Sequence, residues 1–236
     1  MIMVFKKKKV IAAACLLALC AGLTGAGYQM FRSKGAFLPT ENKTVIIDAG
    51  HGAPDGGAVG SAGVLEKDLN LAIAQKLQQF LEQGGTNVIV TRSDDNGIYD
   101  VSGNIRSKKN SDLKNREKLM KESSADAFVS VHMNKFPDGQ YSGPQVFFSG
   151  NNEKSEGLAK QVQSALIEAL APPSSREVKK ADGSIYLLKQ AKLPAILVEC
   201  GFLSNEEEQK KLLDDSYQKQ VAWAIYCGIL KYFNEE

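Results

Sequence analysis

Short apolar runs alternate with longer amphipathic segments along most of the chain. The runs at 44–48, 87–91, 127–132, 145–148 and 195–200 have the length and the nearly continuous apolar character of strands buried on both faces. A helical period of apolar residues predicts helices over 66–83, 112–122, 153–171, 205–213 and 216–232. This alternation predicts an α/β fold in which helices cover both faces of a mostly parallel sheet.

Two stretches break the alternation. Residues 93–111 are polar and have no period, and residues 171–183 form a second irregular segment. Connections of this length are uncommon in a compact domain and are usually functional or disordered. We therefore expect both segments to be irregular.

The first 43 residues differ from the rest of the chain. Four lysines, Lys6 to Lys9, precede about 14 apolar residues and then a run of small residues ending at Ala26, which is the layout of a secretory signal. The apolar run is short for a membrane span, which needs about 20 residues, but both a cleaved signal and an uncleaved anchor fit it. We expect a signal peptide or signal-anchor at 1–26, a linker at 27–43 and one catalytic domain at 44–236.

Charge and cysteine content narrow the class of protein. The net charge of +2 comes from the four lysines near the start, and the remainder carries 25 basic against 27 acidic residues. A nearly neutral body gives no electrostatic argument for nucleic-acid binding. Only Cys200 and Cys227 lie outside the predicted signal, both in apolar runs, so we expect them to fill the core rather than to form a disulfide.

Both histidines of the chain lie where a predicted strand ends. His51 follows the first strand, His132 ends the third, and Glu199 lies near the end of the fifth. The carboxyl ends of parallel strands meet at one edge of a sheet, and ligands of α/β proteins bind there. A single histidine in such a position is more often structural. The coincidence of all three residues favours a shared site.

Two imidazoles and one carboxylate are the usual protein ligands of a catalytic zinc ion. Glu66 is the best candidate for the carboxylate, because it follows a glycine-rich loop that can return it to His51. Asp48 and Asp55 are rival ligands, and Asp48 fits better as the residue that orients His51. The sequence therefore predicts a Zn²⁺ site formed by His51, Glu66 and His132.

Glu199 has the position expected of a general base. It follows the apolar run PAILV, and burying its carboxylate without a partner would be costly. A metal-bound water is a suitable partner, because the carboxylate can take its proton during attack on a carbonyl group. An ion pair with Arg92 or Arg116 is the structural alternative. Cys200 faces away from Glu199 in a strand, and the chain has no G-x-S-x-G elbow, so nucleophilic catalysis is disfavoured.

Five stretches between residues 45 and 212 resemble one known family: VIIDAGHGAPDGGAVGSAGVLEKDLNLAIAQKL, VIVTR, LKNREKLMKESSADAFVSVHMN, GPQVFF and LPAILVECGFLSNEEEQKKL. The family is that of the zinc-dependent N-acetylmuramoyl-L-alanine amidases of the amidase-3 group. The resemblance implies that His51, Glu66 and His132 bind zinc and that Glu199 is catalytic. It also implies an α/β sandwich around a twisted, mostly parallel six-stranded sheet.

The reaction implied by the resemblance is hydrolysis of the amide between N-acetylmuramic acid and L-alanine of the stem peptide in peptidoglycan. The segment 94–110 and the form VECGFLSN look like the CwlD type, amidases associated with sporulation and germination that act in muramic-δ-lactam formation in the spore cortex. We accordingly expect an exported protein on the forespore or cortex side. Its expected partners are peptidoglycan and an accessory protein that supports the zinc site. We expect no nucleic-acid partner and membrane contact only through the N-terminal segment.

Two other functions fit parts of the same pattern. Another peptidoglycan metallopeptidase, cutting within the stem peptide, would use the same ligands. A non-catalytic wall-binding scaffold would be expected to lack a ligand or Glu199, whereas all four positions are filled.

Overall fold

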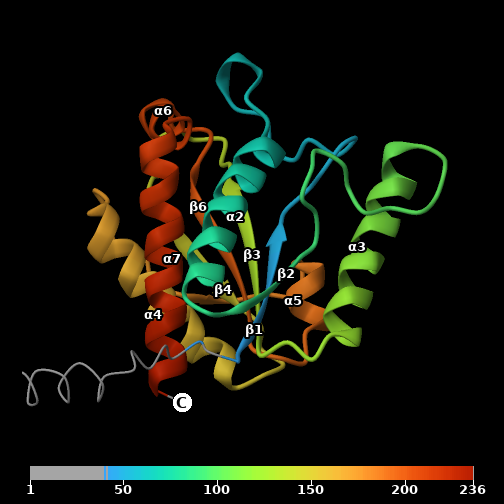
Figure 1. Cartoon of the computed structure of the whole chain (residues 1–236). Coiled ribbons are helices and arrows are strands. Elements are labelled where there is room, and N and C mark those ends of the chain that lie inside the picture. Colours follow the sequence, from blue (N-terminus) through green and yellow to red (C-terminus); the bar gives the residue numbers. More distant parts are fainter. Residues whose placement is uncertain (1–39, 41, 236) are drawn as a thin grey trace, which may run out of the picture. The chain divides into compact units, whose positions relative to one another are not determined.

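The strands form a single six-stranded sheet that runs through the centre of Figure 1. The computed structural model describes residue 40 and residues 42–235. Within this part the strand order is β2-β1-β3-β6-β4-β5. β1, β2, β3 and β6 are mutually parallel, whereas β4 is antiparallel to β6 and parallel to β5. The predicted mostly parallel six-stranded sheet is confirmed. The strands are β1 (Thr44–Ala49), β2 (Asn87–Val90), β3 (Ala127–Asn134), β4 (Gln145–Phe148), β5 (Lys179–Lys180) and β6 (Ala195–Phe202).

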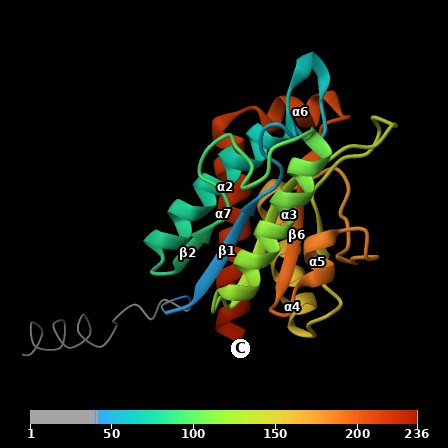
Figure 2. The same ribbon diagram turned by 90° about the vertical axis from the view of Figure 1, so that its right-hand side faces the viewer.

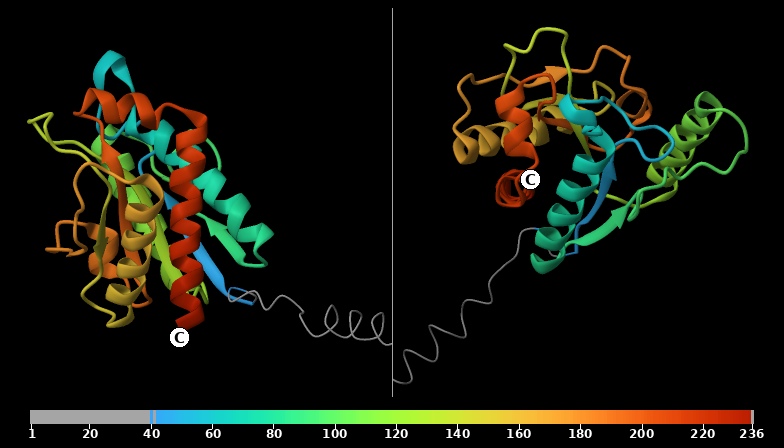
Figure 3. Two further views of the ribbon diagram at one scale, coloured as in Figure 1. Left: turned by 90° about the vertical axis from the view of Figure 1, so that its left-hand side faces the viewer. Right: turned by 90° about the horizontal axis from the view of Figure 1, so that it is seen from above.

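Helices cover both faces of the sheet, as predicted. One layer contains α2, α4 and α7, and the left-hand view of Figure 3 looks onto it. The other face carries α3 and α5, which lie in front of the strands in Figure 2. The helices are η1 (Ser61–Gly63), α2 (Glu66–Gln83), α3 (Ile105–Glu122), α4 (Lys154–Leu170), α5 (Tyr186–Gln190), α6 (Glu206–Leu212) and α7 (Asp215–Glu235).

The alternation of side chains along β1 divides the core in two. Val45 and Ile47 enter the larger cluster beneath α2, α4 and α7. Ile46 enters the smaller cluster beneath α3 and α5. Successive residues of a strand point to opposite faces, so a strand buried on both faces is apolar at nearly every position. The residue after Ile47 is Asp48, and its carboxylate lies on the same face as Ile46.

Helix α3 begins at Ile105, seven residues before the predicted start at 112. Its first residue is preceded by Asn104, whose side chain accepts a hydrogen bond from Ser107 N at 2.9 Å and caps the helix. The first two turns are almost entirely exposed, so they carry no apolar period that the sequence could reveal. The prediction that residues 93–111 are irregular was therefore wrong for residues 105–111, which belong to α3.

Three short elements, η1, β5 and α5, were not predicted. β5 has only two residues, both exposed, and it exists because Phe147 and Phe148 of β4 pair with it. α5 has five residues, too few for a periodic pattern. Leu187 and Leu188 of α5 pack against the smaller core cluster, so tertiary packing stabilises this helix.

The predicted signal or anchor at 1–26 lies outside the described residues, as does most of the predicted linker at 27–43. In the remainder, none of the helices combines the length and the apolar character needed to cross a membrane.

Candidate metal centre and active site

His51, Glu66 and His132 converge at the carboxyl ends of β1 and β3. One ligand atom from each lies within 4.8 Å of the others. Glu66 lies between the two histidines, with Oε2 at 3.2 Å from His51 Nε2 and Oε1 at 2.9 Å from His132 Nδ1. Two imidazoles and a carboxylate form a donor set that suits zinc. The structure thus brings together the three residues predicted as ligands.

The parallel pairing of β1 and β3 places the two histidines side by side. Ala49, the last residue of β1, is in register with Val131, which precedes His132. Glu66 reaches them because it is the first residue of α2, where the N-terminal end of the helix dipole favours a carboxylate. Backbone N–H groups of Ala58 and Met133 donate to the Glu66 carboxylate at 2.7 and 3.1 Å. The glycine-rich loop therefore folds around Glu66 and holds it against the strands.

The protonation of His51 and that of Glu66 are both shifted in the cluster. Burial alone would lower the pKa of His51, but hydrogen bonds to Asp55 and Glu66 prevail and raise the pKa to about 9. Burial would raise the pKa of Glu66, but the two histidines prevail and hold that pKa far below its usual value. In the metal-free protein, a proton on the imidazole of His51 therefore balances the negative charge. A divalent cation would take over this role.

The turn that carries His51 is held in an unusual backbone conformation. His51 has φ of +61°, a left-handed value that is rare for a residue with a side chain. The preceding residue must be glycine, because a Cβ on Gly50 would lie 2.2 Å from His132 Nε2. Two buried arginines fix the carbonyl groups of the turn: Arg92 Nη2 donates to Gly50 O at 3.0 Å, and Arg116 Nη2 donates to His51 O at 2.6 Å.

Asp55, and not Asp48, orients the His51 ring. His51 Nδ1–H donates to Asp55 Oδ2 at 2.9 Å, which leaves Nε2 directed at Glu66. The predicted role of Asp48 was wrong, because its buried carboxylate instead accepts from Arg116 Nη1 at 2.5 Å and from Thr91 Oγ1 at 2.9 Å. Asp48 alternates with Ile47 along β1 and so faces α3, where Arg116 lies.

Glu199 lies beside this cluster, on the neighbouring strand. It is in direct register with His132 across the β3–β6 pair. Its Oε2 atom is buried and has no hydrogen-bond partner within the described residues. Burial, assisted by the nearby Glu66, raises the pKa of Glu199 to about 7, although both histidines act in the opposite direction. A buried carboxylate oxygen without a partner, next to His51, Glu66 and His132, indicates that a ligand such as a metal-bound water belongs there.

The alternatives considered for Glu199 and Cys200 do not fit the structure. Arg92 donates to backbone carbonyl groups. Arg116 is engaged by Asp48, Asp112 and the turn of His51, so neither arginine pairs with Glu199. Cys200 lies in the larger core cluster, on the opposite face of β6, and it is a free thiol, as is Cys227.

A mostly apolar cavity of about 290 Å³ opens next to Glu199 and His132. Leu113 of α3, Leu197 of β6 and residues 184–188 line it. This cavity could not be predicted from the sequence, because residues of the unpredicted α5 line it. Another residue that was missed is Lys109, which contacts Asp55 Oδ2 at 2.8 Å. Lys109 lies in a segment predicted to be irregular.

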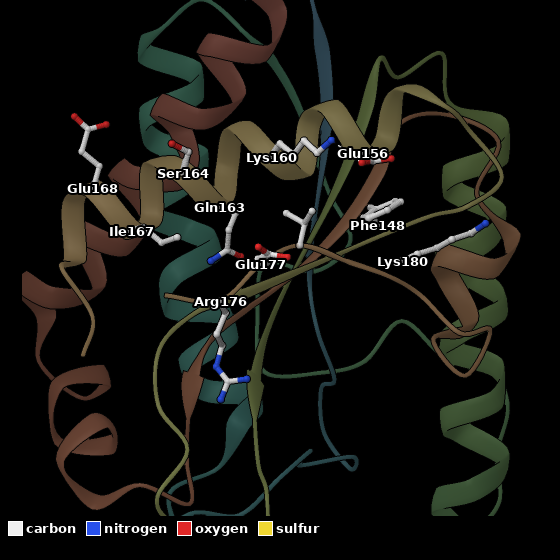
Figure 4. Close-up of a pocket in the computed structure, with 11 residues that line it drawn as sticks. Phe148, Glu156, Lys160, Gln163, Ser164, Ile167, Glu168, Arg176, Glu177 and Lys180 are labelled. Atoms are coloured by element: carbon white, nitrogen blue, oxygen red, sulfur yellow. Dashed lines mark ion pairs between the residues drawn. The ribbon is translucent and has the colours of Figure 1, made fainter. Parts of the chain in front are cut away.

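A larger cavity of the described part lies elsewhere, and Figure 4 shows it. It measures about 710 Å³ and is bounded by α4 and by residues 176–180. Phe148 and Ile167 contribute its apolar lining, and Glu156 and Lys160 form an ion pair at its rim. It contains no histidine or cysteine, and none of the four candidate site residues lines it.

Solved structures of cell-wall amidases share this fold. The CwlD amidase from Clostridioides difficile, in a structure with the GerS lipoprotein, is 45% identical and superimposes with a TM-score of 0.80, covering 83% of this chain and all of that one. An N-acetylmuramoyl-L-alanine amidase from Clostridium difficile 630 is 34% identical, with a TM-score of 0.71, and covers 82% of this chain and 98% of that one.

Sequence relatives agree with the structural ones. The germination-specific N-acetylmuramoyl-L-alanine amidase of Bacillus subtilis is 39% identical over 84% of this chain and 83% of its own length. Residues 45–231 match the family described as N-acetylmuramoyl-L-alanine amidase, Amidase_3. The chain belongs to this family and is an N-acetylmuramoyl-L-alanine amidase.

Proposed function

We propose that the protein is a zinc-dependent amidase in which His51, Glu66 and His132 hold the metal and Glu199 is the catalytic base. The observation that carries this proposal is the convergence of three ligand atoms beside a buried carboxylate that lacks a partner. The donor set fits zinc, because it offers two imidazoles and one carboxylate and leaves room for water. Bound zinc would polarise the scissile carbonyl group and lower the pKa of water.

Glu199 has the position and the proton affinity for the transfers of the reaction. With a pKa near 7 in the metal-free protein, its carboxylate can both accept and return a proton around neutral pH. Glu199 takes a proton from the water that attacks the carbonyl carbon between the lactyl group and L-alanine. It then delivers the proton to the departing amide nitrogen, so that L-alanine leaves as a free amine.

His51, Asp55 and Glu66 prepare the site before substrate arrives. The Asp55 carboxylate fixes the ring of His51 with Nε2 directed inward, and the backbone N–H groups of Ala58 and Met133 fix Glu66. Ligands that are held in place by their neighbours lose little freedom on binding a metal.

We further propose that the reaction serves muramic-δ-lactam formation in the spore cortex, outside the cytoplasmic membrane. The similarity to a germination-specific amidase supports this role. An exported location is consistent with the signal-like segment at 1–26. An accessory protein that supports the metal site is part of the proposal, because the similar CwlD amidase forms a complex with the GerS lipoprotein.

The test combines metal analysis with wall digestion by the full chain. We expect about one zinc ion per chain and release of peptides with free N-terminal L-alanine from purified peptidoglycan. Glu199→Gln should keep the zinc and lose on the order of 10³-fold in kcat, within the range of general-base catalysis. Glu207→Gln, which alters an exposed carboxylate of α6, is the matched control and should retain full activity.

Two outcomes would contradict the proposal. Products cut within the stem peptide would identify a peptidase instead. A wild-type protein that binds no zinc and cuts nothing, even with extract of sporulating cells added, would exclude the metal-dependent mechanism.

A further inference from the structure

Exposed apolar side chains are concentrated around the candidate active site. Seven large apolar residues of the described part are exposed, and five of them lie on the loops that follow β1, β2 and β3 or at the start of α3: Val59, Val101, Ile105, Phe136 and Tyr141. These loops all leave the carboxyl ends of parallel strands. Large exposed apolar side chains that gather at one edge mark a binding surface more often than scattered ones do.

Phe136 and Tyr141 are the aromatic members of this group. Both lie on the loop 135–144 between β3 and β4, which extends beside α6 in Figure 2. Phe136 is 48% exposed and Tyr141 is 37% exposed, and their ring centroids are 4.8 Å apart in an edge-to-face arrangement. We call these two side chains the aromatic shelf.

The loop that carries the aromatic shelf is anchored to the start of α6. Phe136 N donates to Ser204 Oγ at 3.1 Å, and Asn205 Nδ2 donates to Gly139 O at 2.9 Å. At the far end of the loop, Gly143 N donates to the buried Glu208 carboxylate at 2.6 Å. These bonds order the shelf before any ligand binds, which reduces the entropy cost of binding.

Arg176 and Phe202 both pack against Tyr141 of the shelf. The guanidinium of Arg176 lies over the Phe202 ring at 4.8 Å and over the Tyr141 ring at 5.7 Å. Arg176 Nε also donates to Ser142 O at 3.0 Å. A cation stacked on an aromatic ring fixes the orientation of that ring. One face of the Tyr141 ring is thus covered by a charged group, which holds the ring in place.

The shelf lies a few residues along the chain from two of the candidate site residues. Phe202, which stacks on Tyr141, is three residues beyond Glu199 along β6, roughly 10 Å at the rise of a strand. Phe136 is four residues beyond His132 on β3. A substrate bound at Glu199 through the lactyl group of one sugar would therefore place neighbouring sugars of the same strand near the shelf.

We propose that the aromatic shelf binds a sugar ring of the glycan strand next to the muramic acid under attack. This inference rests on the proposed amidase function. The axial C–H groups of a pyranose ring carry partial positive charge and stack on the negative face of an aromatic ring. Asp138 and Gln140, on the same loop, are exposed and add polar groups that can bind sugar hydroxyl groups. The surface of two aromatic side chains matches one or two sugar rings. It is far smaller than the ~800 Å² per partner of a standard protein interface, so a sugar fits the shelf better than a protein does.

The test measures binding of the full chain to peptide-free glycan strands, with free N-acetylmuramic acid as the short comparison ligand. Phe136→Ala/Tyr141→Ala should bind the strands about tenfold more weakly and keep its zinc content, whereas binding of the single sugar should not change. Phe136→Trp/Tyr141→Trp should bind the strands as well as wild type. Trp223→Ala removes an aromatic residue of similar exposure, 49%, from α7 and is the matched control.

Each outcome decides the proposal. Equal strand affinity for wild type and the double alanine variant overturns it. A defect confined to capture of a partner protein also overturns it, because the shelf would then be a protein interface. If the protein binds strands through the shelf but cuts no wall, the proposed function fails, and only glycan binding by the shelf is supported. If it cuts walls and the shelf does not affect strand binding, only this inference fails.

Discussion

Arg116 Nη2 donates a hydrogen bond to the carbonyl oxygen of His51 at 2.6 Å, so a buried charge on α3 fixes the turn that presents a candidate metal ligand. The same guanidinium binds the Asp48 and Asp112 carboxylates. It therefore connects the stability of the domain to the geometry of the metal centre.

Arg116→Lys should destabilise the protein by about 3 kcal/mol, because lysine cannot replace the fork of donors and leaves buried acceptors unpaired. It should also weaken zinc binding in variant protein that is still folded at low temperature, since the left-handed turn at His51 loses a restraint. Urea unfolding and zinc titration measure the two effects. Arg106→Lys, on the exposed side of the same helix, should change neither. If the variant bound zinc as tightly as wild type, Arg116 would not influence the metal centre.

Gly50→Ala should abolish tight metal binding. The added methyl group would lie 2.2 Å from His132 Nε2, so the imidazole must leave its position. Gly157→Ala in α4 is a contrasting control, because its nearest contact would be an ordinary 3.9 Å. That substitution should stabilise the protein by about 0.5–1 kcal/mol, the usual gain of alanine over glycine in a helix. Metal content after dialysis and thermal unfolding distinguish the two variants.

Zinc affinity should rise with pH up to about pH 9. In the metal-free protein His51 has a pKa of about 9, so below that pH zinc must displace its proton. The affinity should therefore fall by about tenfold for each unit of decreasing pH from this one group. Asp55→Asn removes a hydrogen bond that raises this pKa, so the affinity of the variant should stop rising at a lower pH, and its affinity at pH 8 should be lowered about 10–100-fold. Calorimetric titrations in buffers of different ionisation enthalpy count the protons released, and a slope of zero below pH 8 would refute the assignment.

Glu199→Gln should stabilise the metal-free protein in a pH-dependent way. The folded pKa of Glu199 is raised from 4.5 to about 7, chiefly by burial, so the ionised carboxylate destabilises the fold. This cost is absent below the unfolded pKa, grows as the pH rises through this interval, and is complete above pH 7. The advantage of the variant should thus increase by about 2–3 kcal/mol between pH 5 and pH 8. Urea unfolding at the two pH values tests this, with Glu207→Gln as an exposed control. A constant difference would show that Glu199 is not buried as an unpaired acid.

The succession of the longer strands and helices along the chain could be predicted from the sequence, because most of the sheet is buried on both faces. A strand such as β3 is apolar at every buried position except Ser130, and the helix α2 that covers it shows one apolar stripe. The same reasoning locates His51, His132 and Glu199, since polar residues at the ends of apolar runs stand out. Glu66 was identifiable because a glycine-rich loop leads directly into its helix.

Short-range spacing could not decide between Asp48 and Asp55 as the partner of His51. Both lie within four residues of it, and the outcome depends on the left-handed turn at His51 and on the position of Arg116, which is 65 residues away along the chain. The sequence alone therefore determined which residue types meet at the edge of the sheet. The tertiary structure decided which atoms face one another.

Elements with few residues or exposed surfaces were decided by tertiary structure alone. α5 is too short for a period, the start of α3 is polar on all sides, and the aromatic shelf joins loop 135–144 to Arg176 from another loop. The sequence determined the sheet, its covering helices and the convergence of four chemical groups, because burial imposes a pattern that can be read. The sequence could not determine the elements that surround these groups, because those elements depend on contacts between residues far apart in the chain.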